Sequence, residues 1–135
     1  MDHLAIQFRA LQIFAHRAHH DTHGETFFQD HEFFGKLYPA YESAYDDVVE
    51  RIIGLGSETL NLAKINEEAA KHAAIKPNEH SPHVFFNVLL ATEKQLCQMC
   101  AEAMKKATEG TKNLLAQLCD DSEKRQFLIK KRIAK

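Results

Sequence analysis

The chain has 135 residues, 44% of them hydrophobic and 27% charged, a composition that predicts a single globular domain with one core over residues 1–135. The formal net charge of -2 and the isoelectric point near 6.5 argue against a generally basic surface that coats nucleic acid. No segment approaches the ~20 apolar residues of a membrane span, and the first residues do not resemble a secretion signal, so we expect a cytoplasmic protein without a membrane partner.

The first predicted helix runs from about Asp2, its expected N-cap, to about His20. Apolar residues recur at helical spacing on two faces. One face carries Leu4, Phe8, Leu11, Ala15 and Ala18, and the other carries Ile6, Ala10 and Ile13. A helix that is apolar on more than one side suits a subunit packed inside an oligomer.

A second helix of about thirty residues follows a short loop at Asp21 to Gly24 and ends at a Gly-Leu-Gly stop. One stripe predicts an ordinary core face and consists of Phe34, Tyr38, Tyr41, Tyr45, Val48 and Ile52. The neighbouring edge carries His31, Gly35, Glu42, Asp46 and Glu50. One imidazole and three carboxylates beside an apolar stripe indicate a half-buried metal edge.

Nine histidines are many for this length, and six of them lie within the first 31 residues. If the first two helices fold back on each other, His19 lies opposite His31. His31 and Asp46 are about 22 Å apart along one helix axis, so one ion cannot touch both in one chain. The chain therefore supplies two half-sites, and a two-fold dimer that packs the second helix antiparallel on its twin, centred near Pro39, would join His19 and His31 to Asp46 and Glu50.

Residues 57–74 predict a short helix that crosses between two helical hairpins, and Lys76-Pro77-Asn78 breaks it. Ser81-Pro82 predicts an N-cap and a first helical residue, so a third long helix runs from about Pro82 to about Thr108. Its apolar residues follow helical spacing and predict a core face: Phe85, Leu89, Leu96, Met99, Cys100, Ala103 and Ala107.

Gly110 is expected to end the third helix, and Thr111 to cap a last one. The apolar positions of this last helix are Leu114, Leu115, Leu118, Phe127, Leu128 and Ile133. No segment shows the alternation of apolar and polar residues that would predict a β-strand. Four long helices with a short helix in the crossover between helices two and three predict an all-α, ferritin-like four-helix bundle.

Cys97, Cys100 and Cys119 do not form a disulfide framework, and the Cys97–Cys100 spacing lies inside a helix rather than in a βαβ unit. We expect small buried residues, with a thiol site for iron or zinc as the alternative. The tail from Ser122 to Lys135 carries six basic residues. These offset the dipole of a helix end, and DNA binding by this tail is the less favoured interpretation.

Several of these residues together resemble the Dps-like miniferritins in order and spacing, closely over residues 4–75 and collinearly to the end. They are His16, His19, Gly24, Phe27-Phe28, His31-Glu32, Leu37-Tyr38, Asp46, Glu50-Arg51 and Leu55-Gly56. In that family a histidine, a second histidine twelve residues on, and an Asp-x-x-x-Glu pair before an arginine form an iron-oxidising site between two subunits.

The resemblance implies a ferroxidase-type oxidoreductase that forms a hollow, twelve-subunit shell built from two-fold dimers. Fe(II) would be oxidised with hydrogen peroxide or dioxygen and stored as ferric mineral, which protects against oxidative damage. His19 and His31 would bind iron from one subunit and Asp46 and Glu50 from its partner, with Glu50 bridging to a second iron. Zinc is a substitute that the same ligands accept.

Three positions depart from the family pattern. Gly35 stands where a carboxylate is usual, His20 stands where tryptophan is common, and Pro39 is expected to bend the helix at the carbonyl of Gly35. Glu42 and Glu32 are both candidates for the missing ligand. These departures keep two alternatives open: a non-catalytic shell or DNA-associated protein with a degenerate metal site, and a protein that sequesters zinc through its histidines.

Overall fold

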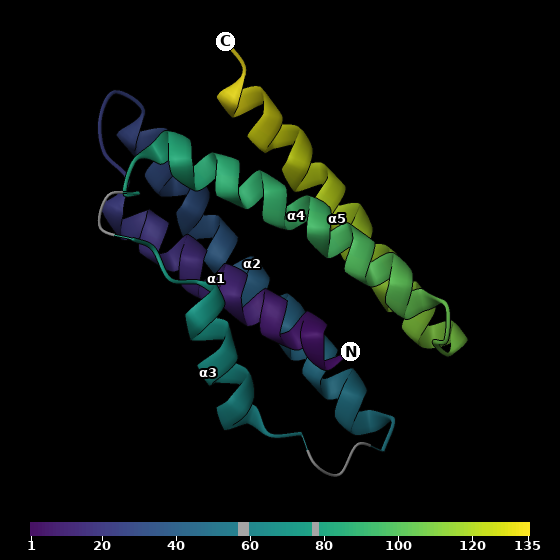
Figure 1. Ribbon diagram of the computed structural model, residues 1–135. Helices are drawn as coiled ribbons and strands as arrows, with labels where there is room; N and C mark the ends of the chain where they lie inside the picture. The colour runs from purple at the N-terminus through teal and green to yellow at the C-terminus, as the bar shows by residue number, and fades with distance from the viewer. Residues whose placement is uncertain (57–59, 77–78) are drawn as a thin grey trace. The chain divides into compact units, whose positions relative to one another are not determined.

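The computed structural model describes residues 1–56, 60–76 and 79–135. These residues form helices α1 (Asp2–Asp21), α2 (Phe27–Gly54), α3 (Leu62–His72), α4 (Pro82–Met104) and α5 (Glu109–Ile133), and none of them lies in a strand (Figure 1). The prediction of an all-α chain is confirmed. In the described part of the chain, no helix is both long and apolar enough to cross a membrane.

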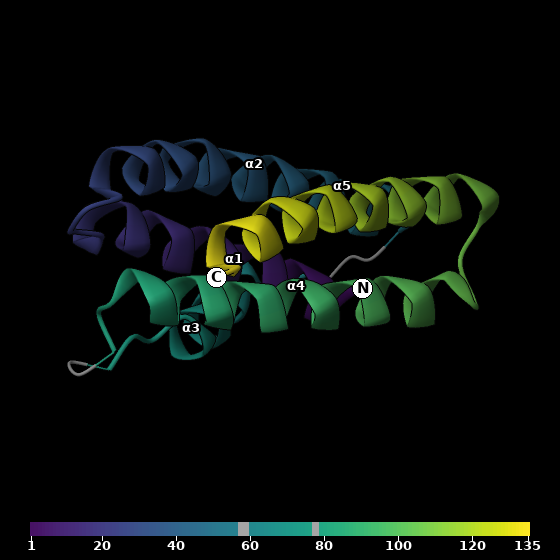
Figure 2. The same cartoon turned by 90° about the horizontal axis from the view of Figure 1, so that it is seen from above.

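The chain divides into two compact units, residues 1–85 and 86–135. In the first unit α1 and α2 run side by side as a hairpin, and α3 also contacts α1 (Figure 2). The largest buried side chains of this unit come from both long helices and include Phe8, Phe34 and Tyr41. The stripe predicted from Leu4 to Ala18 on α1 and, apart from Tyr38, the stripe predicted for α2 therefore form its core. On the second face predicted for α1 only Ala10 is buried, and Ile13 is 36% exposed.

The ends of α1 and α2 follow from local chemistry. The helix α1 begins at Asp2, but Met1 occupies the N-cap position and no side chain caps it, so the prediction of Asp2 as N-cap is wrong. Asp2 instead places a negative charge in the first turn, where the helix dipole favours it. The helix α2 continues through Pro39 and ends at Gly54, and Gly56 adopts a φ of +95°, which glycine tolerates.

The helix α3 starts later than predicted because Asn61 caps it. The side chain of Asn61 accepts a hydrogen bond from the backbone N–H of Lys64 at 3.0 Å. The predicted start at Ser57 to Thr59 and the predicted stop at Pro77-Asn78 lie outside the described residues. The helix ends at His72, before Lys76.

Two threonines decide where α5 begins. Thr108 is the N-cap, because its hydroxyl oxygen accepts from the N–H of Thr111 at 3.3 Å. Thr111, the predicted cap, is buried in the first turn, and α4 ends at Met104 rather than Thr108. The predicted cap of α4 is confirmed, since the Ser81 hydroxyl accepts from the N–H of Val84 at 3.2 Å.

The buried face of α5 differs from the apolar stripe predicted for it. Phe127 and Leu128 are 58% and 50% exposed. The buried residues instead recur every three or four positions and include polar ones: Thr111, Leu115, Leu118, Ser122, Gln126 and Ile129. The prediction is wrong for Phe127 and Leu128 because it rested on apolar residues alone, whereas polar Ser122 and Gln126 occupy the buried face and join a buried polar cluster described below.

Candidate functional site

The loop between α1 and α2 brings His19 and His31 together. His19 lies in the last turns of α1, and His31 lies near the start of α2. Gly24 adopts a φ of +94° in the loop, and the Thr26 hydroxyl donates to the Asp30 carboxylate at 2.7 Å. The two imidazole rings stack with centroids 3.8 Å apart and an interplanar angle of 16°, as the predicted hairpin requires.

Each of these two histidines hydrogen-bonds to the backbone of the other. Nδ1 of His19 lies 2.7 Å from the carbonyl oxygen of His31, and Nδ1 of His31 lies 2.7 Å from that of His19. A carbonyl oxygen only accepts, so each Nδ1 carries the proton, and a neutral imidazole then keeps its lone pair on Nε2. This is how metal-binding histidines are held in proteins, with the other ring nitrogen donating to a fixed acceptor.

Further aromatic rings surround the pair. Phe27 stacks on His31 with centroids 5.0 Å apart, and the ring of Tyr38 lies 5.6 Å from that of His19. His16 stacks on Tyr38 at 4.1 Å. Tyr38, predicted as an ordinary core residue, is only half-buried and belongs to this ring array.

Gly35 lies directly against His19. A Cβ atom at position 35 would lie 2.9 Å from Cε1 of His19, closer than real Cβ atoms come, and 3.1 Å from Nδ1, which is also a tight contact. The imidazole of His19 therefore uses the space that a side chain at position 35 would occupy. The resemblance to the miniferritins implies a carboxylate at position 35, and the structure adds that the glycine found there makes room for a histidine.

The carboxylates of the proposed site lie elsewhere on α2. Asp46 and Glu50 are exposed and follow His31 by four to five turns of a continuous helix, so this chain does not bring them to the histidines. Both candidates for the missing ligand are exposed as well, and Glu32 forms an ion pair with Lys36 at 3.1 Å.

A polar contact that the sequence did not predict holds the segment before α4. The Asp21 carboxylate accepts from Nε of Arg17 at 2.6 Å and from Nδ1 of His80 at 2.7 Å. Partial burial acts to raise the pKa of Asp21, but the hydrogen bonds from Arg17 and His80 outweigh it and hold that pKa below its ordinary value of 3.8. This contact ties His80 to the end of α1, two residues from His19.

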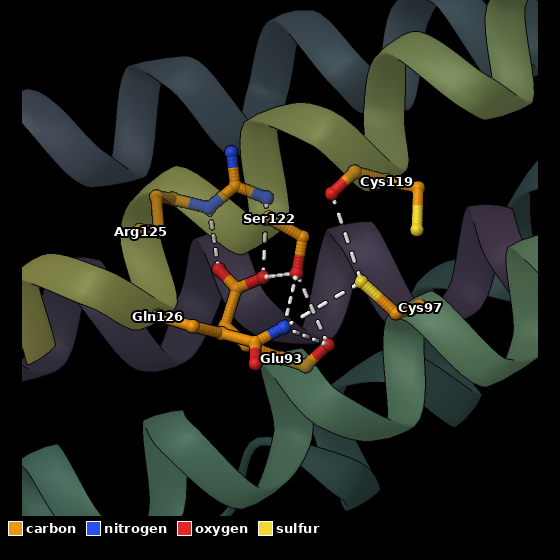
Figure 3. Close-up of polar contacts among 6 residues, drawn as sticks. All are labelled: Glu93, Cys97, Cys119, Ser122, Arg125 and Gln126. Carbon is orange, nitrogen blue, oxygen red and sulfur yellow. Dashed lines mark hydrogen bonds and ion pairs between the residues drawn. The ribbon is translucent and has the colours of Figure 1, made fainter. Parts of the chain in front are cut away.

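The second unit contains a buried charged cluster between α4 and α5 (Figure 3). Glu93 is fully buried, and its carboxylate accepts from Nε and Nη2 of Arg125 at 2.5 and 3.2 Å and from the Ser122 hydroxyl at 2.5 Å. The burial of Glu93 could have been predicted from the sequence. Glu93 lies four residues after Leu89 and three before Leu96, in the middle of an apolar stripe, and a buried charge is paired in folded proteins.

Potential metal ligands also meet in this second unit. In the part of the chain that the structure describes, three or more such side chains approach one another only at Cys97, Cys119 and Glu123, whose ligand atoms lie within 4.8 Å of one another. Cys97 and Cys119 are half-buried, whereas Cys100 is fully buried. The expectation that all three cysteines are small buried residues therefore holds for Cys100 alone.

Comparison with known proteins adds three findings. A family model described as "Ferritin-like domain" matches residues 2–135. The DNA protection during starvation protein of Helicobacter pylori (strain J99 / ATCC 700824) is 28% identical over 96 residues, which cover 66% of this chain and 62% of that protein. The crystal structure of Helicobacter cinaedi CAIP matches with a TM-score of 0.75 and 22% identity over 98% of this chain and 99% of the other, a likeness of fold.

Proposed function

Because this chain belongs to the ferritin-like domain family, we propose that it is a miniferritin that oxidises Fe(II) with hydrogen peroxide or dioxygen and stores the ferric product inside an oligomer. The predicted ferritin-like helical fold and the resemblance to Dps-like miniferritins are confirmed by the comparisons. The activity, its site residues, the twelve-subunit shell, the single domain over residues 1–135 and the cytoplasmic location are parts of the proposal.

The observation that supports this proposal best is the pair of reciprocal hydrogen bonds between His19 and His31. With both Nδ1 protons donated to carbonyl oxygens, Nε2 is the lone-pair atom of each ring, and two imidazoles offer ligands that Fe(II) accepts. A core histidine without a ligand role needs no second histidine held in the mirror arrangement. We therefore assign His19 and His31 as Fe(II) ligands.

We propose that Asp46 and Glu50 of a second subunit complete the site. Both are exposed on α2, and carboxylates suit iron in either oxidation state. Exposed apolar side chains at both ends of α2 support packing of this helix on its twin: Phe28 is 82%, Ile53 53% and Leu55 57% exposed. A two-fold dimer of this kind would contain two equal sites.

In the proposed reaction iron is the substrate. Two Fe(II) ions each lose one electron, and hydrogen peroxide takes up both electrons and two protons to become two molecules of water. The histidine and carboxylate ligands hold the ions in place and stabilise the higher charge of Fe(III). Zinc accepts the same mixed ligands but has no redox chemistry, so we expect it to compete with Fe(II) and inhibit.

Replacing the two histidines tests the assignment. Rapid iron oxidation after mixing Fe(II) and peroxide with protein is expected in the wild type and in His72→Gln, an exposed histidine of α3. The double variant His19→Gln/His31→Gln should lose it while circular dichroism and mass remain unchanged. Undiminished oxidation in a folded double variant would remove these residues from the site.

Gly35 favours a second candidate, a shell that binds iron weakly or not at all. The ring of His19 fills the space beside this glycine, and no carboxylate stands there. Light scattering and iron analysis on the same size-exclusion peak separate the candidates. A large particle with many irons per chain supports oxidation and storage, and a large particle without iron supports the non-catalytic shell.

DNA association, the other part of this candidate, has less support. The basic tail is helical up to Ile133, Arg125 pairs with Glu93, and the Arg132 guanidinium lies 4.8 Å from the ring centre of Phe86. These residues are engaged within the second unit. We therefore expect weak DNA binding that disappears as the salt concentration rises.

A further inference from the structure

We propose that Cys97, Cys119 and Glu123 form a second metal site, which takes zinc or a similar thiol-binding divalent cation. The site lies in the second unit and contains none of the residues assigned to iron oxidation. It does not rest on the proposed function, and its ligand chemistry is different.

The geometry of the three side chains supports the proposal. Cys97 comes from α4, while Cys119 and Glu123 lie one turn apart on α5 and so share a face of that helix. Their sulfur and oxygen atoms lie within 4.8 Å of one another. Two sulfurs bound to one tetrahedral zinc ion are about 3.8 Å apart, so only a small inward movement is needed, and Glu123 is exposed and able to rotate.

A supporting hydrogen bond already points at one of the sulfurs. Nε2 of Gln126 lies 3.5 Å from Sγ of Cys97 (Figure 3). The same nitrogen contacts the Ser122 hydroxyl at 3.2 Å and the carbonyl oxygen of Glu93 at 3.4 Å, which fixes the amide in place. Metal sites in proteins depend on such supporting contacts, which hold a ligand atom in position.

The residue types select the metal. Two thiolates and one carboxylate suit zinc, and they disfavour magnesium and calcium, which prefer oxygen ligands alone. Three protein ligands leave one tetrahedral position for water. The thiol of Cys97 now donates to the carbonyl oxygen of Cys119 at 3.7 Å, and this proton would leave when the metal binds.

Cobalt provides a direct readout, because Co²⁺ bound to thiolate gives a charge-transfer absorption that histidine and carboxylate ligands do not. We expect the reduced, full-length protein to develop this absorption on titration with Co²⁺ and to lose it when Zn²⁺ is added. Cys97→Ala and Cys119→Ala should each weaken zinc binding by at least about tenfold, and Glu123→Gln should weaken it as well.

Cys100→Ala is the matched control. Cys100 lies one turn after Cys97 on α4 but is fully buried and outside the ligand set, so its removal should leave the cobalt absorption unchanged. The double variant His19→Gln/His31→Gln should also keep the absorption, which separates this site from the iron site. Absorption that persists in a folded Cys97→Ala/Cys119→Ala protein, or that never appears in the wild type, would overturn the proposal, as would a disulfide between the two in place of metal binding.

Discussion

At the scale of single residues, two positions hold a residue type that is unfavourable there by itself. Gly35 is a poor helix residue, yet it leaves the space in which the ring of His19 reaches the carbonyl oxygen of His31. Glu93 is a charged residue in a buried position, yet it accepts charge-assisted hydrogen bonds from Arg125. In each case a locally unfavourable residue is compatible with the fold because of one specific neighbour.

Replacing Gly35 by alanine tests whether His19 needs the space beside this residue. Alanine in place of glycine inside a helix usually stabilises by about 0.5–1 kcal/mol. Here the added Cβ would lie 2.9 Å from the imidazole of His19, so we expect no gain in urea stability and weaker Fe(II) binding by calorimetry. Gly54→Ala is the control, since a Cβ at Gly54 meets nothing within 4 Å. Equal gains in both variants would contradict the role given to Gly35.

Replacing Arg125 by methionine should reveal the cost of burying the Glu93 carboxylate without its partner. This change removes two hydrogen bonds from a buried carboxylate, and breaking a buried ion pair from one side costs about 3–5 kcal/mol. Lys124→Met is the matched control, because Lys124 pairs with Asp120 in solvent and such pairs contribute about 0–1 kcal/mol. Urea unfolding measures both variants. Similar losses in the two would show that Glu93 and Arg125 do not form a strong pair.

The sequence was sufficient to predict some of these residues but not others. The spacing of His19 and His31 about a short loop predicts their meeting, because a helical hairpin is local in the chain. The contacts of Glu93 with Ser122 and Arg125 join residues about thirty positions apart. They depend on the register of α5 against α4, which hydrophobic periodicity does not give when the facing residues are polar.

At the scale of elements, the ends of the helices depend on single polar groups. Thr108 and Thr111 lie on either side of Gly110, and both are good N-cap residues, so the sequence alone does not choose between them. The structure selects Thr108, which leaves Thr111 buried in the first turn of α5. At the end of α1 the Asp21 carboxylate binds two side chains instead of the helix backbone, those of Arg17 and His80.

The contact at Asp21 should make stability depend on pH in a defined direction. A carboxylate whose pKa is lower in the folded state stabilises the fold above its ordinary value of 3.8, and this contribution is lost as the pH falls through the lowered pKa. The stability difference between wild type and Asp21→Asn should therefore be largest near neutral pH and disappear in acid. Asp120→Asn, in an exposed ion pair with Lys124, should show little difference at any pH, as urea midpoints will reveal. A difference for Asp21→Asn that is constant with pH would contradict the ion pair.

At the scale of the whole molecule, the two pairs of proposed iron ligands lie far apart within one chain. His19 and His31 meet near the loop, while Asp46 and Glu50 are exposed further along the same continuous helix. The distance follows from the helical rise, so it could be predicted from the sequence. The apolar part of the partner surface could not, because Phe28, Ile53 and Leu55 lie outside the predicted core stripe and only the structure shows that no other part of the described chain covers them.

A site shared between subunits makes a prediction that a site within one chain does not. The variants His19→Gln/His31→Gln and Asp46→Asn/Glu50→Gln should each lack rapid Fe(II) oxidation. When equal amounts are unfolded and refolded together, half of the dimers contain one chain of each kind, and one of the two sites in such a dimer has all four ligands. The mixture should therefore recover about one quarter of the wild-type rate. Variants refolded separately and then combined are the control and should stay inactive. If mass spectrometry finds both chains in one assembly and oxidation is still absent, the iron site is not shared between subunits in the way proposed.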